Sequence, residues 1–244
     1  MFPIFLIFLL IYSNFPIGKI KIFGARSFKE KELIRVLGLK KGENFSPPIL
    51  RSSLLRLENY YKGKGFFEVT VESTKVEKRK EKIFISIFLS EGRRKYIGQI
   101  LFRGAEVIDS AILLKIYGHI PPYPYDVDIL GDGESKILEA YAERGFPYIE
   151  ISRDEDILNG DTLIIVYTID GGPRVYIRKI ILEGNKKVRR KILEREVDIK
   201  PGDLYKSSKI IETKRRLFST GLFRSVRHEL REIHGKEDSI DVAL

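Results

Sequence analysis

The order of hydrophobic and polar positions repeats three times along the chain, with a period of 80 residues. Each copy opens with a short, mostly apolar segment that ends at a glycine. Two segments of helical periodicity follow, and two extended segments close the copy. The residues that mark the period are three glycines and three aromatics: Gly24, Gly104 and Gly184, and Phe45, Tyr125 and Tyr205. Such a period predicts three copies of one supersecondary unit with the order β-α-α-β-β.

The helices of the first copy carry start and stop signals. Ser27 and Glu30 stand at the spacing of a capping box, and Gly38 follows the last apolar position of that helix. In the middle copy Gly131 and Gly133 interrupt the second helix, and their low helix propensity predicts a delayed or frayed start. The buried face of the second helix in the first copy recurs at spacings of 4, 3 and 4: Leu50, Leu54, Leu57 and Tyr61.

The closing strands determine how each sheet is ordered. Residues 67–71 alternate apolar and polar positions, whereas residues 83–89 and 163–169 are almost continuously apolar, as a central strand under helices is. The last two strands then form an antiparallel hairpin, the first strand lies parallel to the third, and the second is a free edge. We therefore predict an α+β protein of three tandem modules, each a three-stranded mixed sheet covered by two helices. Their limits are 19–94, 95–174 and 175–244, with the final strand of the third module incomplete at the C-terminus.

An apolar run from Phe2 to Tyr12 sets the start of the chain apart from the modules. Its length is that of the apolar core of a secretory signal, and it falls short of the ~20 residues that a membrane helix needs. We predict that residues 1–18 are a signal segment. An uncleaved inner-membrane anchor stays open as an alternative, because no basic residue precedes the run and no small-x-small cleavage site follows it.

The net charge of +10 is divided unevenly among the modules. The first and third carry net charges of +10 and +7, and the middle one carries −7. A nucleic-acid-binding protein needs one continuous basic face, which an acidic middle module interrupts. KH-like modules also pack two helices on a three-stranded sheet, but none of the turns between the helices here holds their GXXG phosphate clamp. We expect no nucleic-acid partner.

Residue patterns for catalysis or metal binding do not stand out. The chain has no cysteine, which excludes disulfides, thiol nucleophiles and Cys-based metal sites. The three histidines (His119, His228 and His234) show no ligand spacing, and there is no Ser-His-acid set or phosphate-binding loop. We expect neither an enzyme nor a cofactor or metal site.

The free edges are the candidate binding sites, since an extended peptide can pair with the unpaired N–H and C=O groups of an edge strand. Pro147 stands where the middle edge begins and predicts one missing donor there. The three glycines that mark the period are expected in turns with positive φ rather than in ligand contact. The candidate edge residues are Phe67, Val69, Val71, Ile149, Ile151, Phe223 and Val226.

Short motifs in these copies match a known family. In the third copy they are residues 180–185 (IILEGN), 200–205 (KPGDLY) and 221–226 (GLFRSV), and in the first copy 41–45 (KGENF), 65–69 (GFFEV) and 90–92 (SEG). Over residues 19–244 the chain thereby resembles the tandem POTRA repeats of the BamA/TamA family of outer-membrane assembly factors. Ala25 and Ala105 stand where Asn185 does, so the turn motif is weaker in the first two copies.

The resemblance implies a periplasmic scaffold at the cell outer membrane. Such repeats precede a membrane β-barrel, so we expect the natural protein to continue beyond Leu244. They receive unfolded outer-membrane polypeptides and accessory periplasmic or lipoprotein partners, with β-augmentation as the binding mode. The alternative is a free-standing or inner-membrane-anchored scaffold of the secretion or cell-division type.

Overall fold

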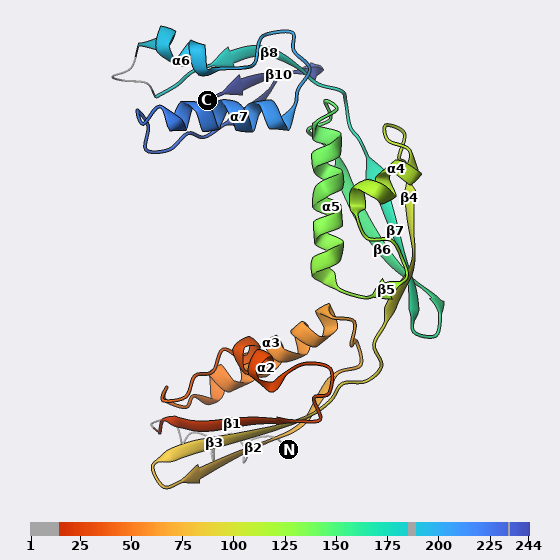
Figure 1. The fold of residues 1–244 in the computed structure, drawn as a ribbon, viewed down its shortest axis with the longest axis vertical. Coiled ribbons are helices and arrows are strands. Elements are labelled where there is room, and N and C mark those ends of the chain that lie inside the picture. The colour runs from red at the N-terminus through yellow and green to blue at the C-terminus, as the bar shows by residue number, and fades with distance from the viewer. Residues whose placement is uncertain (1–14, 185–188, 234) are drawn as a thin grey trace. The chain divides into compact units, whose positions relative to one another are not determined.

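The computed structural model describes residues 15–184, 189–233 and 235–244 (Figure 1). Most of the predicted signal segment, residues 1–14, lies outside the described residues. The first strand, β1 (Ile17–Phe23), begins within the last residues of that predicted segment. The first module therefore starts earlier than the apolar pattern around Ile20 indicated.

The first module has the predicted topology. Strand β3 lies in the centre of its sheet, parallel to β1 and antiparallel to β2, in the order β1-β3-β2. Both helices cover one face of this sheet (Figure 1). After β1 its elements are α2 (Glu30–Leu37), α3 (Pro47–Gly63), β2 (Thr70–Arg79) and β3 (Lys82–Ser90).

The middle module repeats this order with one addition. A two-residue strand, β5, joins the outer side of β4, so the sheet has four strands in the order β5-β4-β7-β6 instead of the predicted three. Proline favours an extended backbone and is tolerated in edge strands, and β5 contains Pro124. The elements are β4 (Tyr96–Arg103), α4 (Ser110–Tyr117), β5 (Tyr123–Pro124), α5 (Val127–Ala142), β6 (Glu150–Asn159) and β7 (Thr162–Asp170).

The third module again has three strands, in the order β8-β10-β9, with β10 parallel to β8 and antiparallel to β9. Its elements are β8 (Tyr176–Ile181), α6 (Arg190–Glu196), α7 (Ser207–Ser219), β9 (Glu229–Ile233) and β10 (Lys236–Ala243). None of the helices in the described part combines the length and the hydrophobicity that crossing a bilayer requires.

The chain forms two compact units, and the division passes through the middle module. One unit holds the chain up to Gly98 with Pro122–Asp128 and Ile157–Leu163. The other holds Gln99–Pro121, Ile129–Asp156 and Ile164–Leu244.

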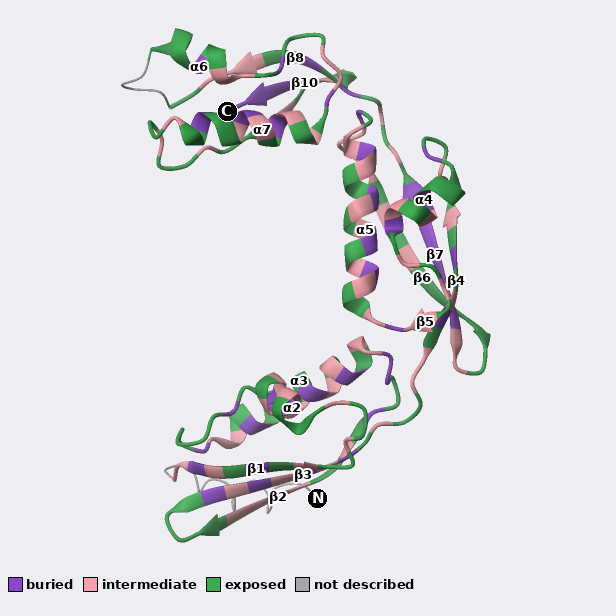
Figure 2. Cartoon of the chain, in the orientation of Figure 1, coloured by how far each residue is buried: buried purple, intermediate pink, exposed green. Residues whose placement is uncertain are grey.

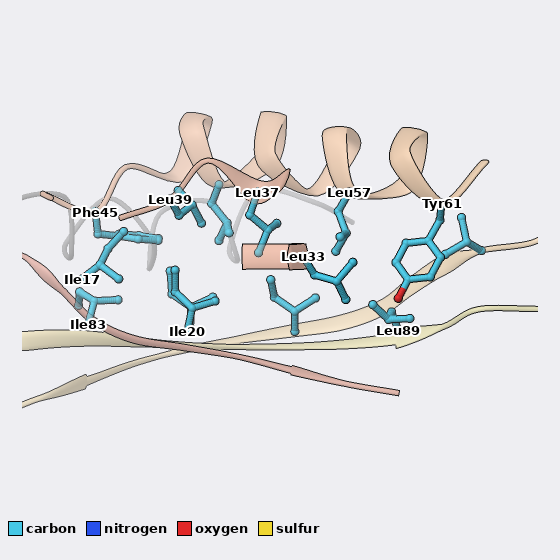
Figure 3. Close-up of a cluster of buried hydrophobic side chains, with 14 of the residues drawn as sticks. Ile17, Ile20, Leu33, Leu37, Leu39, Phe45, Leu57, Tyr61, Ile83 and Leu89 are labelled. Carbon is cyan, nitrogen blue, oxygen red and sulfur yellow. The ribbon is translucent and has the colours of Figure 1, made fainter. Parts of the chain in front are cut away.

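The core of the first module lies between its helix pair and the sheet. Leu33 and Leu37 of α2 and Leu57 and Tyr61 of α3 point toward the strands and are fully buried (Figure 3). Figure 2 shows the same division in each module, with buried residues where helices and strands face each other. Burying one such side chain contributes about 1.5–3 kcal/mol to folding. Of the predicted helix face, Leu50, Leu57 and Tyr61 are buried, and Leu54 is partly buried against the core.

The predicted capping box at the start of α2 does not form. The helix begins at Glu30 without a side-chain cap, and the Ser27 hydroxyl instead donates to Glu91 at the end of the sheet. That carboxylate also accepts from the Tyr61 hydroxyl and from the backbone amides of Arg26 and Ser27. We call this group, Glu91 with its donors on Arg26, Ser27 and Tyr61, the Glu91 clasp. Gly38, in the left-handed region at φ 67°, ends α2 as the sequence predicted.

The prediction of a frayed helix in the middle module was wrong. Helix α5 runs without interruption through Gly131 and Gly133. The ring of Tyr117 packs so closely on Gly133 that a Cβ there would overlap it. At the corresponding position the first and third modules have small buried residues, Ser53 and Thr213. The glycine is thus explained by side-chain packing, which helix propensity does not take into account.

Candidate peptide-binding edges

The second strand of each module lies at the edge of its sheet. β2, β6 and β9 each have one neighbour, β3, β7 and β10 respectively. The other edge is formed by the first strand, or by β5 where that strand is covered. An edge strand leaves every second backbone N–H and C=O without a partner in the sheet, and these groups are what an added strand would pair with.

The opposite edge is closed at its start by the turn between the helices. In the first module Pro16 pairs with Asn44, in the middle one Tyr96 pairs with Pro124, and in the third Tyr176 pairs with Leu204. These pairs repeat every 80 residues. In each turn the next residue is a buried aromatic whose amide donates to a backbone carbonyl, at 2.9–3.0 Å: Phe45 to Phe15, Tyr125 to Lys95 and Tyr205 to Val175.

This closure makes the two edges unequal. The aromatic side chain anchors the turn, and the turn occupies part of the backbone of the first strand. Within the described residues, no such turn pairs with β2, β6 or β9. The repeated aromatics were visible in the sequence, but the strand pairing beside them was not, because it depends on how the turn folds back.

The start of the β2 edge is partly blocked. The amide of Val71 donates to Glu58 Oε1 of α3, at 3.2 Å. The register with β3 shifts between Val71 and Ser73, so Glu72 is the extra residue of a bulge. An incoming strand would therefore compete with Glu58 at Val71 and meet regular backbone only from Ser73 onward.

Beyond the bulge β2 is paired with β3 without interruption as far as Arg79. From Lys75 to Arg79 its side chains are charged except for Val76, and Glu77 forms ion pairs with both Lys75 and Arg79. Those hydrogen bonds hold the pKa of the Glu77 carboxyl below its usual range. Exposed pairs of this kind stabilise a protein little, and charges on an edge strand discourage uncontrolled aggregation.

The β6 edge differs in charge. Arg153 donates to Glu134 of α5 at 2.6 Å and lies 3.4 Å from Glu155. The other acidic side chains of the strand are exposed: Glu150, Asp154 and Asp156. Pro147 lies in the turn before the strand, so the expected loss of a donor from this edge does not occur.

The β9 edge is the shortest, with five residues. Arg231 of this strand pairs with Glu183 and Glu229, each at 2.9 Å. Beside β9 lies an open groove of ≈ 650 Å³ whose lining includes Phe223, Val226 and His228. Burial, together with the charge of a nearby lysine, lowers the pKa of His228.

The strands begin later than their sequence pattern indicated. Val71 and Ile151 lie in β2 and β6, but the other candidate residues precede their strands. In the first module a turn joins α3 to β2, closed by the amides of Phe66 and Val69. Val69 is part of the buried core, and the ring of Phe67 packs edge-on against Tyr125, with centroids 4.9 Å apart. The remaining candidates, Ile149, Phe223 and Val226, lie in the segments that lead into β6 and β9.

The glycines that mark the repeat follow the first strand of each module. Gly24, Gly104 and Gly184 have φ of 88°, 68° and 81°, a region that side chains with a Cβ rarely adopt. At Gly24 and Gly104 a Cβ would also overlap a backbone carbonyl of the central strand, at Leu89 and Ile169. No ligand contact is needed to explain glycine at those two positions.

Three mixed sheets of this topology, each under a helix pair and each with its second strand at an edge, define a class of tandem-repeat scaffold. The chain belongs to the POTRA family: the family model described as surface antigen variable number repeat matches residues 15–92 and 175–244. This membership argues against the KH-like alternative.

Relatives and solved structures agree with this assignment. The outer membrane protein assembly factor BamA of Nitratidesulfovibrio vulgaris is 28% identical over 242 residues, which cover 93% of this chain and 30% of the relative. BamA of Neisseria meningitidis is 23% identical with the same coverage. The chain thus spans about a third of the length of these curated relatives.

Two solved structures share the fold. The crystal structure of Haemophilus influenzae BamA POTRA3-5 has a TM-score of 0.65 and 23% identity, covering 93% of this chain and 94% of that one. BamA from Haemophilus ducreyi lacking POTRA domains 1–3 has a TM-score of 0.53 and 21% identity, covering 62% of this chain and 28% of that one.

Proposed function

We propose that the chain is a non-catalytic, polypeptide-binding scaffold of an outer-membrane protein assembly factor, located on the periplasmic face of the outer membrane. Membership of the POTRA family supports this, as does similarity along 93% of the chain to relatives named outer membrane protein assembly factor BamA. The partners that fit are unfolded outer-membrane polypeptides and accessory periplasmic proteins or lipoproteins.

The binding mode that we propose is β-augmentation. The observation that supports it is a difference between the two edges of each sheet. The inter-helix turn pairs with the start of the edge formed by the first strand, whereas within the described residues no such turn pairs with the edge formed by the second strand. A client strand would pair through its backbone, which every sequence shares. The edges differ in length and charge, so they would hold different segments of a client.

A peptide titration of the full chain tests this function. The probe is a decapeptide of alternating valine and threonine, and the readout is the set of backbone amide signals in an NMR spectrum. We expect signals of β2, β6 or β9 to shift, and those of β1, β4 and β8 to stay in place. The same peptide with alternate amides N-methylated cannot form the ladder and should not bind. Equal binding of both peptides, or shifts confined to the helices, would refute β-augmentation.

Removing the carboxylate at Glu58 should open the start of the β2 edge. In Glu58→Ala the Val71 amide loses its acceptor, so peptide affinity at β2 should rise several-fold, while the first module loses about 1 kcal/mol of stability. Glu58→Gln keeps an acceptor oxygen and serves as the control. If both variants bind the peptide with the affinity of the parent chain, Glu58 does not compete with the peptide for the Val71 amide.

A further inference from the structure

The first and middle modules build the same turn between their first strand and first helix. Residues 21–30 and 101–110 have the same order of strand, bend and helix residues, and Gly24 and Gly104 both have positive φ. In the first module the Glu91 clasp closes this turn. Glu91 Oε1 accepts from the amides of Arg26 at 2.8 Å and Ser27 at 3.0 Å, and Oε2 accepts from the Ser27 hydroxyl at 2.8 Å.

The Glu91 clasp also satisfies a buried hydroxyl. Tyr61 is fully buried, and its hydroxyl donates to Glu91 Oε1 at 2.9 Å. Partial burial raises the pKa of Glu91, but the hydrogen bonds from Ser27, Arg26 and Tyr61 outweigh it and lower the pKa overall. The carboxylate is therefore held in its charged form as the acceptor for all of these donors.

The middle module keeps the tyrosine and lacks the carboxylate. Tyr141 stands 80 residues after Tyr61 and is fully buried, and none of the described residues accepts a hydrogen bond from its hydroxyl. Gly171 takes the place of Glu91. A Cβ on Gly171 would lie 3.5 Å from Tyr141 Cε1 and 3.5 Å from Val107 Cγ2, in ordinary contact. Position 171 thus faces the tyrosine and offers it no acceptor.

The neighbouring groups do not replace the missing acceptor. The Asp170 carboxylate accepts from the Gly172 amide at 2.9 Å, and no hydrogen bond joins it to Tyr141 within the described residues. Burial raises the pKa of Tyr141, while the Ile108 amide and the positive charge of Arg144 lower it. The Ile108 amide donates its hydrogen bond and Arg144 is a cation, so neither group can accept a hydrogen bond from the Tyr141 hydroxyl. Val107 stands in place of Ser27, and its amide donates to no group in the described part of the chain.

We propose that this turn of the middle module is a binding site for a carboxylate that another polypeptide supplies. The carboxylate lies over Gly171 and accepts from the Tyr141 hydroxyl and the Val107 amide, as Glu91 does within the first module. Val107 is 37% exposed and Gly171 is half-buried, so the group enters from the surface as the Val107 side chain moves aside. An acidic side chain and a free chain terminus share this chemistry. The site is independent of the edge strands.

Four small probes separate the two sources of the carboxylate. N-acetylglutamate amide carries a side-chain carboxylate, N-acetylglutamine a terminal one, N-acetylglutamate both, and N-acetylglutamine amide none. Each is titrated into the full chain while the Val107 amide and Tyr141 ring signals are followed by NMR. We expect shifts with carboxylate-bearing probes only, and the stronger of the two single-carboxylate probes identifies the source. Equal shifts with the uncharged probe, or no shifts with any of them, overturn the proposal.

Variants locate the site. Tyr141→Phe removes one donor and should weaken binding about tenfold, the usual effect of losing a hydrogen bond to a charged group. Gly171→Glu supplies an internal carboxylate and should abolish probe binding while shifting the Val107 amide by itself. Tyr61→Phe, the matched change in the first module, should leave probe binding intact. If Tyr141→Phe and Gly171→Glu bind the probes as the parent chain does, the site is not at this turn.

Discussion

Replacing Gly133 with alanine should destabilise the middle module by up to about 2 kcal/mol, although the same change raises helix propensity. The added Cβ would overlap the Tyr117 ring, and Tyr117 is fully buried, so the ring has no free space into which it can move. Forcing extra atoms into a packed core costs about 1–3 kcal/mol. The roughly 1 kcal/mol that alanine gains over glycine in a helix offsets part of this cost. Hydrogen exchange of the α5 amides, read by mass spectrometry, measures the loss within this module.

Gly131 provides the matched control, two residues earlier in the same helix. A Cβ there would have no atom within 4 Å, so Gly131→Ala should stabilise α5 by about 0.5–1 kcal/mol. A second control rebuilds the packing of the first module, where Leu37 and Ser53 stand in place of Tyr117 and Gly133. Tyr117→Leu should therefore lessen the cost of Gly133→Ser. Equal effects of alanine at positions 131 and 133 would show that the Tyr117 ring does not decide the residue.

Glu91→Ala should destabilise the first module by about 2–4 kcal/mol. The change removes the acceptor from two backbone amides and two hydroxyls, one of which, on Tyr61, is fully buried. Leaving a buried donor without a partner costs about 1–3 kcal/mol, and the more exposed donors add less because water replaces the acceptor. The loss of unfolding free energy can be measured by urea unfolding, with hydrogen exchange of the α2 and β3 amides as the readout.

The same group predicts a dependence of stability on pH. The pKa of Glu91 is lower in the folded chain than its usual value of 4.5, so the folded state favours the charged form. The contribution of the Glu91 clasp is complete above the usual value and is lost as the pH falls through the folded one. Glu91→Ala should remove this part of the acid sensitivity. Glu81, which is exposed and 3.6 Å from Lys78, is the control: Glu81→Gln should change stability little and leave the acid sensitivity that comes from the Glu91 clasp in place.

Sequence alone determined the repeat and, apart from β5, the order of elements and the topology of the sheets. Gly24, Gly104 and Gly184 all adopt positive φ, which glycine adopts more readily than other residues. The 80-residue spacing of this requirement can therefore be read from the sequence alone. The continuous apolar run of residues 83–89 likewise identifies a central strand without knowledge of its neighbours. The second strand follows as an edge because no other order satisfies this pattern with two helices on one face.

Contacts between residues distant in the chain decided the rest. Glu91, 64 residues away, accepts a hydrogen bond from the Ser27 hydroxyl, and α2 begins only at Glu30, without a side-chain cap. Gly133 weakens α5 by itself and is favourable only because Tyr117 of another helix fills the space above it. The true starts of β2, β6 and β9, and the turn that closes the opposite edge, also depend on partners that alternation of residues does not reveal. Local preferences of about 1 kcal/mol or less specify the elements, and tertiary contacts worth more than that override them wherever the two disagree.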